Sequence, residues 1–467
     1  MARPGHGSVI AGRVPGAILP GHPVPLTPPA CCRSVQRAVA LRPWRHAAPC
    51  DLLACGSLLR KAALTDTPNN SRFARRLIGL AGLAGLLLVS TPLAAQETDP
   101  RVSAVQKIAQ DAFDTLDLNA LLLEVRIDGE PLVTLARGEA MPGVPLTVDG
   151  QFRNGAVALT YVAALALRLA EAGRFDLDRP IAEWLPDLPA ADTATPRMLL
   201  NMTAGYPDHA ANDKGFLEPF YADPFHQWTP EELIDVSLST PRRFAPGENW
   251  DYSHSGYVIL GRVLEAATGE SLAALMQHHV LDPLELSQTH DFDTPYVPQP
   301  VVHSYTGERG VWEDATYWNP SWTLPRGAVQ VTSISDMARS FDRITGIDGF
   351  LQPDSRKAMI EPSLIGFGSP LEGCPNCRTL NSTFSYGLGT MLLGDWIAQT
   401  PSFAGNASAV ATLPEGRSPE GRVTIAVAVT YREAAFDDWQ GNVPNRASDI
   451  LLEIAGELVP DTPPPGR

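Results

Sequence analysis

The segment Tyr252-Ser253-His254-Ser255 sets two hydroxyls beside a phenol and an imidazole. A hydroxyl can attack an acyl carbon when a neighbouring base takes its proton, and tyrosine or histidine can act as that base. Thr160, in a different part of the chain, is a further candidate hydroxyl. A second interpretation of His254 is a polar residue at a helix start, hydrogen-bonded within the fold. The residues alone leave both interpretations open.

Other catalytic and metal-binding motifs are absent from the sequence or only weakly supported by it. The sequence has no G-x-S-x-G elbow, no H-E-x-x-H zinc motif and no Walker loop. Cys374 and Cys377, spaced C-P-N-C, favour a loop disulfide in an exported protein. A thioredoxin-like redox site is the alternative, but it would need a βαβ context. Two cysteines alone cannot form a zinc knuckle. We therefore expect no cofactor and no metal.

Composition and charge place the chain among globular proteins. Its 467 residues carry 36 Lys+Arg against 52 Asp+Glu, a net charge of −16, which argues against a nucleic-acid partner. The charge is uneven, because residues 1–95 hold 11 basic and 2 acidic residues. The remainder holds 25 against 50, a balance of −25. The first 95 residues are therefore a different kind of polypeptide.

The leader contains a typical export signal. The uncharged apolar run 77–89 follows Arg72, Arg75 and Arg76, and small residues up to Ala95 suggest cleavage there. Residues 77–95 are therefore predicted to be a signal peptide, and the mature protein to be periplasmic or secreted. An uncleaved membrane anchor is the alternative, since 19 uncharged residues can span a bilayer. Residues 1–76 are predicted to be a disordered or non-native leader, with the true start near residue 70.

Hydrophobic periodicity predicts the elements that must position the candidate residues. The sequence predicts a hairpin around Asp128-Gly129 and a mixed α/β unit interrupted by helices. Helices are predicted over 102–116, 156–172, 229–239, 257–267, 270–279, 333–345 and 446–458, and strands over 121–127, 131–137, 385–393 and 423–430. Thr160 would then lie on the second helix and Ser255 just before the fourth.

With this order in place, the chain from about 100 to 458 resembles the serine β-lactamase and penicillin-binding-protein superfamily, in the branch of class C β-lactamases, D-alanyl-D-alanine carboxypeptidases and esterases. Five ordered blocks carry the resemblance, at 152–189, 195–206, 246–289, 327–341 and 386–393. It implies an antiparallel sheet flanked by helices, with an inserted helical lobe. The implied domain is 96–460, with an α/β part at about 100–165 and 326–460, a lobe at about 166–325 and a tail at 461–467.

The resemblance also locates three clusters that carry the superfamily's chemistry. The S-x-x-K nucleophile and lysine fall on Ala156 and Leu159, and neither side chain can do that chemistry. The Y-x-N pair falls on Tyr252 and His254. The K-T-G or H-x-G strand falls on residues 399–402, Gln-Thr-Pro-Ser, which offer no basic side chain.

No lysine can rescue the first cluster. The chain has four lysines, Lys61, Lys107, Lys214 and Lys357. None of them has serine three positions earlier, so S-x-x-K occurs nowhere in the chain. The sequence therefore predicts a non-catalytic relative. An active hydrolase using Thr160, Ser253 or Ser255 with Tyr252 or His254, and a structural relic without ligand, are the alternatives.

A cleft is the feature that the resemblance leaves in place. Aromatic residues gather in the implied lobe, among them Trp228, Trp318 and Trp322. With Tyr252, His254 and Thr160, they are candidates to line a cleft for a small molecule, a peptidoglycan-like glycan or a protein. Packing within the lobe is the alternative reading of these aromatics. Arg153, beside the lost nucleophile, is expected to be a surface or ion-paired residue. Contact with a membrane is expected only if the signal segment stays uncleaved.

Overall fold

The computed structural model describes residues 99–465, apart from 292–293, 327, 329–330 and 438–442. The predicted leader (1–76), the signal peptide (77–95), the last two residues of the predicted tail and part of the block 327–341 therefore lie outside the described residues. Among the described helices, none is long and apolar enough to cross a bilayer.

An antiparallel sheet of nine strands forms the centre of the molecule, in the order β3-β2-β1-β13-β12-β10-β9-β8, with β11 paired to β12. Positive φ angles at Asp128 and Gly129 make the tight turn of the β1–β2 hairpin. The strands are β1 (Leu118–Ile127), β2 (Glu130–Met141), β3 (Val144–Pro145), β8 (Ser385–Tyr386), β9 (Met391–Leu393), β10 (Trp396–Gln399), β11 (Ser402–Phe403), β12 (Asn406–Leu413) and β13 (Val423–Tyr431).

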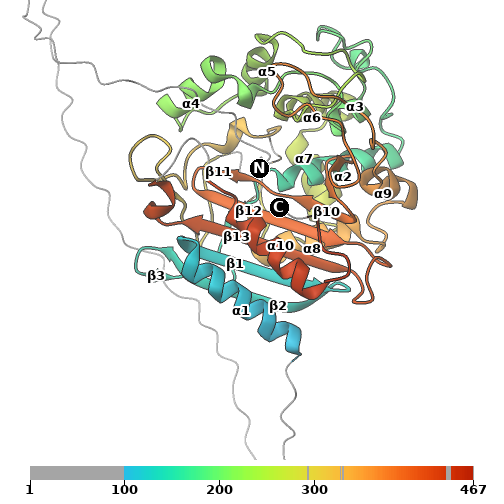
Figure 1. Cartoon of the computed structure of the whole chain (residues 1–467). Coiled ribbons are helices and arrows are strands. Elements are labelled where there is room, and N and C mark those ends of the chain that lie inside the picture. Colours follow the sequence, from blue (N-terminus) through green and yellow to red (C-terminus); the bar gives the residue numbers. More distant parts are fainter. Residues whose placement is uncertain (1–98, 292–293, 327, 329–330, 438–442, 466–467) are drawn as a thin grey trace, which may run out of the picture. The chain divides into compact units, whose positions relative to one another are not determined.

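Helices cover both faces of this sheet (Figure 1). Alternate residues of β13 point to opposite faces, so Ile425 lies on one side of the sheet and Ala426 on the other. Ile425 packs in the core under α1 (Pro100–Thr115) and α10 (Arg446–Leu458). Ala426 packs in the core that contains α2 (Val157–Glu171) and α8 (Ile334–Thr345). β13 is buried along its whole length because both of its faces are covered.

A series of helices fills the chain between α2 and α8, and two of them, α6 and α7, pack against α2 (Figure 1). The series is α3 (Pro196–Leu200), α4 (Glu218–Ala222), α5 (Pro230–Leu238), α6 (His254–Thr268) and α7 (Leu272–Met276), and α9 (Pro353–Ile360) follows α8. Two small sheets complete the fold, β4 (Phe152–Arg153) with β7 (Val331–Thr332) and β5 (Tyr305–Thr306) with β6 (Glu313–Asp314). The predicted mixed α/β class, with an antiparallel sheet flanked by helices, is confirmed. The predicted residue limits of the lobe stay a prediction.

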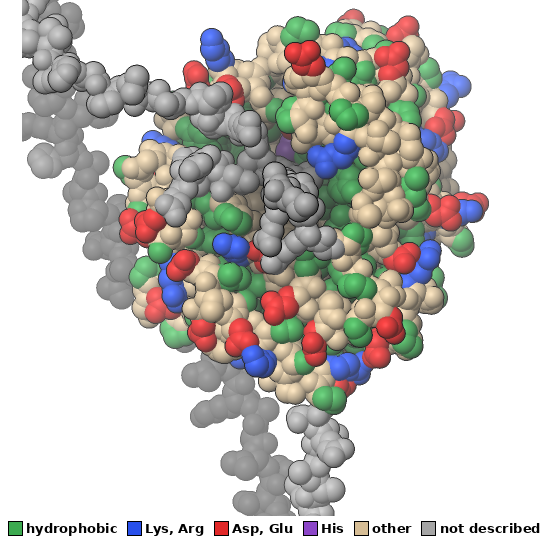
Figure 2. Space-filling model, in the orientation of Figure 1, with side chains coloured by type: hydrophobic (Ala, Val, Ile, Leu, Met, Phe, Trp, Pro, Cys, Tyr) green, Lys and Arg blue, Asp and Glu red, His purple; other side chains and the backbone are tan. Residues whose placement is uncertain are grey.

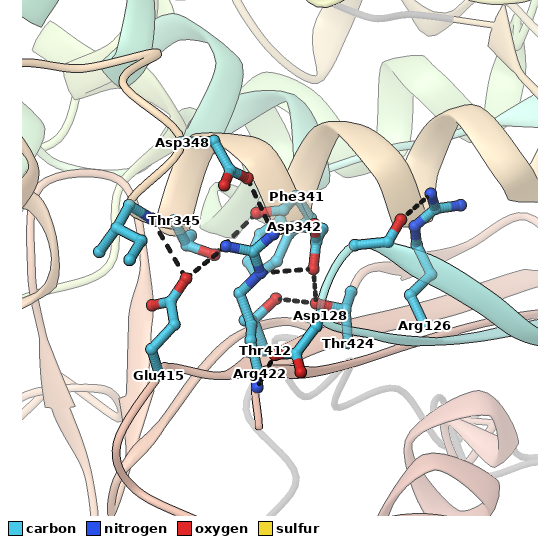
Figure 3. A network of polar contacts seen from close by, with 12 residues as sticks. Arg126, Asp128, Phe341, Asp342, Thr345, Asp348, Thr412, Glu415, Arg422 and Thr424 are labelled. Carbon is cyan, nitrogen blue, oxygen red and sulfur yellow. Dashed lines mark hydrogen bonds and ion pairs between the residues drawn. The ribbon is translucent and has the colours of Figure 1, made fainter. Parts of the chain in front are cut away.

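A buried arginine ties α8 to the sheet (Figure 3). Arg422, just before β13, forms a two-pronged ion pair with Asp342 of α8, at 2.9 and 2.8 Å. Its guanidinium also donates to Asp348 at 2.8 Å and to Glu415. Thr424 of β13 donates a further hydrogen bond to Asp342 at 2.8 Å. These hydrogen bonds take the place of the water that the carboxylate of Asp342 loses on burial.

Candidate functional site

The start of α2 lies against the segment that follows β10. Gly155 has φ +53, and a Cβ on it would come 2.9 Å from Cβ of Pro401, so the two segments touch. Ala156 is 9 % exposed and Leu159 is fully buried. This end of α2 therefore presents methyl and isobutyl groups where the resemblance implied a hydroxyl and an amine.

Thr160, one helical position further on, holds the sheet edge to α2. Its hydroxyl donates to the carbonyl of Gly389 at 2.7 Å, and Nε2 of Gln399 donates to the same carbonyl at 2.8 Å. Nε2 of Gln399 also lies 3.4 Å from Oγ1 of Thr160. Both side chains are buried. The hydroxyl proton of Thr160 is thus engaged on a backbone carbonyl, and Gln399 is the first of the residues 399–402 on which the resemblance placed the basic strand motif.

Tyr252 is also buried, 3 % exposed. Its hydroxyl has no hydrogen-bond partner among the described residues. Burial, with the nearby Tyr386 and Asp208, raises the pKa of Tyr252 well above its usual value. The phenol therefore stays protonated at physiological pH and can donate a hydrogen bond, but it cannot act as the base.

His254 pairs with an aspartate that the sequence analysis did not single out. Nδ1 of His254 lies 3.0 Å from Oδ2 of Asp208, and its backbone N–H donates to Oδ1 at 3.1 Å. Burial opposes ionisation of Asp208, but the charge of His254 and this hydrogen bond outweigh it and lower the pKa of Asp208. The rings of His254 and Tyr252 meet edge to face, with centroids 5.1 Å apart. His254 is thus a helix-start residue held by a buried acid.

Ser255 pairs with a second histidine, His209. Nδ1 of His209 lies 2.9 Å from Oγ of Ser255, and Nε2 lies 2.7 Å from the carbonyl of Trp322. Because a carbonyl only accepts, Nε2 carries the proton and Nδ1 accepts from the serine hydroxyl. Burial lowers the pKa of His209 to about 4, which keeps the ring neutral. Both residues are fully buried.

Ser253, the last candidate hydroxyl, caps the first turn of α6. Its Oγ donates to the carbonyl of Tyr206 at 2.8 Å and accepts from the N–H of Gly256 at 3.2 Å. The structure therefore brings Tyr252, His254 and Ser255 close to Asp208 and His209. Thr160 is bonded to the sheet edge instead.

The three candidate tryptophans belong to one aromatic cluster. Phe216 lies at its middle, with ring centroids 5.2 Å from both Trp228 and Trp322. Phe220 joins Trp318 and Trp322, at 5.7 and 5.3 Å. Trp228 and Trp318 are buried, so much of this aromatic content packs the lobe. Trp322 also reaches the ring of His254, at 6.3 Å, and thereby connects the cluster to the residues around Tyr252.

A hollow lies beside this cluster, between it, β4 and β11. It measures about 400 Å³, with open solvent included, and its walls include Arg153, Trp318, Trp322 and Phe403. Figure 2 shows a depression on one face of the molecule, with hydrophobic side chains and a histidine inside it. The expectation for Arg153 was wrong: it is 6 % exposed and forms no ion pair with a described residue. Arg153 lies on β4, which pairs with β7, and its side chain is buried in the fold.

Cys374 and Cys377 are joined in a disulfide. Within the described residues they form, with Asp251, a group compact enough to hold a metal ion, but the disulfide uses both sulfur atoms. Burial raises the pKa of Asp251 to about 6, against the opposing effect of Arg243, whose Nη1 lies 3.2 Å away. The disulfide loop is thus anchored beside the residue that precedes Tyr252.

Comparisons with known proteins agree on one family. The Beta-lactamase family model matches residues 105–438. Penicillin-binding protein 4 of Amycolatopsis lactamdurans is 28% identical over 363 residues, which cover 75% of this chain and 89% of the relative. Esterase EstB of Burkholderia gladioli is 28% identical over 287 residues, which cover 52% of this chain and 70% of the relative.

Solved structures show the same fold. D-amino acid amidase from Ochrobactrum anthropi SV3, in complex with D-phenylalanine, superposes with a TM-score of 0.62 at 21% identity, covering 78% of this chain and 100% of the amidase. An octameric penicillin-binding protein homologue from Pyrococcus abyssi gives a TM-score of 0.60 at 18% identity, covering 78% of this chain and 79% of the homologue. At these identities the likeness concerns the fold alone.

Proposed function

The chain belongs to the beta-lactamase family of serine-hydrolase relatives, and on that premise we propose that it is an exported, non-catalytic member that keeps a ligand- or partner-binding cleft. The observation that carries the proposal is the start of α2. Ala156 and the fully buried Leu159 replace the nucleophile and the lysine. No proton can be taken from a methyl group, and a buried leucine is more favourable there than an unpaired lysine by about 2 kcal/mol.

The other two clusters support the same proposal. Tyr252 has a pKa raised by burial, which makes it a donor and not a base. Gln399 is committed to the carbonyl of Gly389, so it is not free to hold a substrate carboxylate. A single altered residue can be compensated by a neighbour, but three altered clusters leave neither nucleophile, base nor carboxylate anchor of the family's kind.

A second candidate function rests on the pair Ser255 and His209. A serine hydroxyl 2.9 Å from an imidazole nitrogen has the geometry of an activated nucleophile. The neutral ring and its Nε2 hydrogen bond to Trp322 hold the required tautomer. Against this function, both residues are fully buried, and the backbone N–H of His209 also donates to Oγ of Ser255 at 2.9 Å. Hydrolysis would require this part of the lobe to open.

Covalent labelling separates the two candidates. The full chain is incubated with a fluorescent penicillin and with a fluorophosphonate, and the variant Ser255→Ala serves as the matched control. We expect no stoichiometric labelling by either reagent. Labelling that disappears in Ser255→Ala would establish the second candidate, and labelling that persists would show a different nucleophile. Sequencing the N-terminus of the exported chain tests export, and a first residue well before Leu77 would contradict the predicted signal peptide.

A further inference from the structure

The disulfide loop, residues 361–384 between α9 and β8, lies against a carboxylate from a distant part of the chain. The sulfur atoms of Cys374 and Cys377 and a carboxylate oxygen of Asp251 all lie within 4.8 Å of one another. The three residues are 5, 5 and 7 % exposed. Asp251 comes just before α6, so the spacing of the two cysteines gave no sign of it. The fold thus adds a third ligand atom to the two sulfur atoms that the sequence analysis counted.

The disulfide is not what holds these three groups together. It joins residues three positions apart, so it does not tie the loop to Asp251. That tie is made by Asn249, which donates from Nδ2 to the carbonyl of Ser369 at 3.0 Å and accepts at Oδ1 from the N–H of Ser369 at 2.9 Å. Within the loop, the N–H of Cys377 donates to the carbonyl of Cys374 at 3.3 Å, in a tight turn that suits the proline at its second position. We therefore expect the three groups to stay together when the disulfide is reduced.

The chemistry of the three groups selects the metal. Thiolate is a soft ligand that favours Zn²⁺ over Mg²⁺ or Ca²⁺, and zinc also accepts carboxylate oxygen. Zinc–sulfur bonds of about 2.3 Å and zinc–oxygen bonds of about 2.0–2.2 Å place tetrahedral ligand atoms about 3.5–3.8 Å apart. The three atoms lie within 4.8 Å of one another, and the two sulfur atoms can separate once the bond between them is broken. Three protein ligands leave the fourth zinc position to water.

The charges around Asp251 also suit a zinc ion. Two thiolates and one carboxylate carry three negative charges, of which Zn²⁺ compensates two. Arg243, whose Nη1 lies 3.2 Å from Oδ2 of Asp251, supplies the remaining positive charge. A carboxylate has two oxygens, so it can accept from a guanidinium and bind a metal ion at the same time. The assembled site is therefore neutral, which matters because an uncompensated charge is costly when it is buried.

We propose that Cys374, Cys377 and Asp251 form a zinc site that is available only while the disulfide is reduced. A dithiol reductant gives two electrons and two protons to the disulfide and is itself oxidised to a disulfide. The two thiols then lose their protons to the solvent as Zn²⁺ binds. The inference is independent of the proposed function, because it uses no residue of the three altered clusters and none that lines the hollow.

Zinc titration of the full chain, reduced and oxidised, tests the site. Dithiothreitol reduces the chain and is then removed by gel filtration without oxygen, because it binds zinc itself. Asp251→Asn removes one ligand but keeps the shape of the side chain. Glu372→Gln is the matched control, because it removes an exposed acid from the same loop. The leader also contains cysteines, so every chain carries the changes Cys31→Ser, Cys32→Ser, Cys50→Ser and Cys55→Ser.

We expect the reduced parent to bind one zinc ion per chain at micromolar concentration or below, and the oxidised parent to bind none at that concentration. Asp251→Asn should weaken zinc binding by the reduced chain about tenfold or more, while Glu372→Gln should leave it unchanged. Titration of the reduced parent with Cd²⁺ is a second measurement that needs no variant. It should raise the ultraviolet absorbance through charge transfer from thiolate to metal.

Four outcomes would overturn the inference: no zinc uptake or no charge-transfer absorbance in the reduced parent, equal uptake by the oxidised parent, one ion shared between two chains, or equal effects of Asp251→Asn and Glu372→Gln. Covalent labelling by penicillin would overturn the proposed inactivity instead, whatever the metal titrations give.

Discussion

At the scale of single residues, burial and neighbouring charges shift the pKa values of the side chains in the site. Tyr252 stays protonated, His209 stays neutral, and Asp208 is held ionised by His254. This chain keeps buried polar residues at the site. Each of them is hydrogen-bonded within the fold or, like Tyr252, can act only as a hydrogen-bond donor. Such groups make the stability of the fold depend on pH.

His209 should make the fold sensitive to mild acid. Its pKa is about 4 in the fold and 6.5 in an unfolded chain, so between these values the unfolded chain binds the extra proton. Stability from this group is therefore complete above pH 6.5 and is lost as the pH falls toward 4, at up to about 1.4 kcal/mol per pH unit. Urea unfolding at about pH 7, 6, 5 and 4 measures this slope.

The variant His209→Asn should be less stable at neutral pH. The change of its free energy of unfolding with pH should be smaller by the contribution of about one proton. The exposed His278 provides the control, and His278→Asn should change neither quantity. A slope that survives in His209→Asn would show that another group carries the pH dependence.

The partners of the candidate residues were harder to predict than the candidates themselves. Tyr252 and His254 stand in a recognisable segment, but Asp208 and His209 are 46 residues away from their partners His254 and Ser255. Hydrophobic periodicity carries no information about which distant polar side chains meet. The one available signal was the adjacent Asp-His pair just after the block 195–206.

At the scale of elements, long and strongly periodic segments were predictable from sequence. The last helix is found at Arg446–Leu458, as predicted, and β13 at Val423–Tyr431 extends its prediction by one residue. β12 (Asn406–Leu413) was missed, because a strand buried on both faces shows no alternation and this one is rich in alanine. The predicted strand 385–393 is two short strands, β8 and β9, separated by a turn at Gly389. Gly389 has φ +75, and its carbonyl accepts from Thr160.

The start of α2 gives a prediction at this scale. The double change Ala156→Ser with Leu159→Lys restores the family's S-x-x-K spacing, but it buries an amine at a fully apolar position. We expect a loss of roughly 2–4 kcal/mol in the free energy of unfolding and no family-like turnover of nitrocefin, because Tyr252 and Gln399 still cannot supply base or anchor. Nitrocefin hydrolysis is measured on samples whose circular dichroism shows them folded.

Ala156→Ser alone is the control for that double variant, since a serine at the cap of α2 should cost little. Rapid nitrocefin turnover by the double variant would show that the other two clusters are still competent, and the proposal of three separate losses would then be wrong.

At the scale of the whole molecule, the sheet carries two cores and the site lies where the lobe meets the strand edge. The core with α2 and α8 also includes residues of the lobe, whereas the core under α1 and α10 does not. The site therefore depends on how firmly α8 and its core are held to the sheet. The buried bonds of Arg422 provide this connection (Figure 3).

Removing that arginine should weaken the whole fold. Arg422→Met leaves the carboxylate of Asp342, 2 % exposed, without its ion pair, which should lower the free energy of unfolding by about 3–5 kcal/mol. Adding Asp342→Asn should recover part of the loss, because the buried charge is then gone. The exposed pair Arg417–Asp395 is the control, and Arg417→Met should change stability by less than about 1 kcal/mol. Urea unfolding of the parent and these variants measures the differences, and equal losses for Arg422→Met and Arg417→Met would show that the buried network does not hold α8 to the sheet.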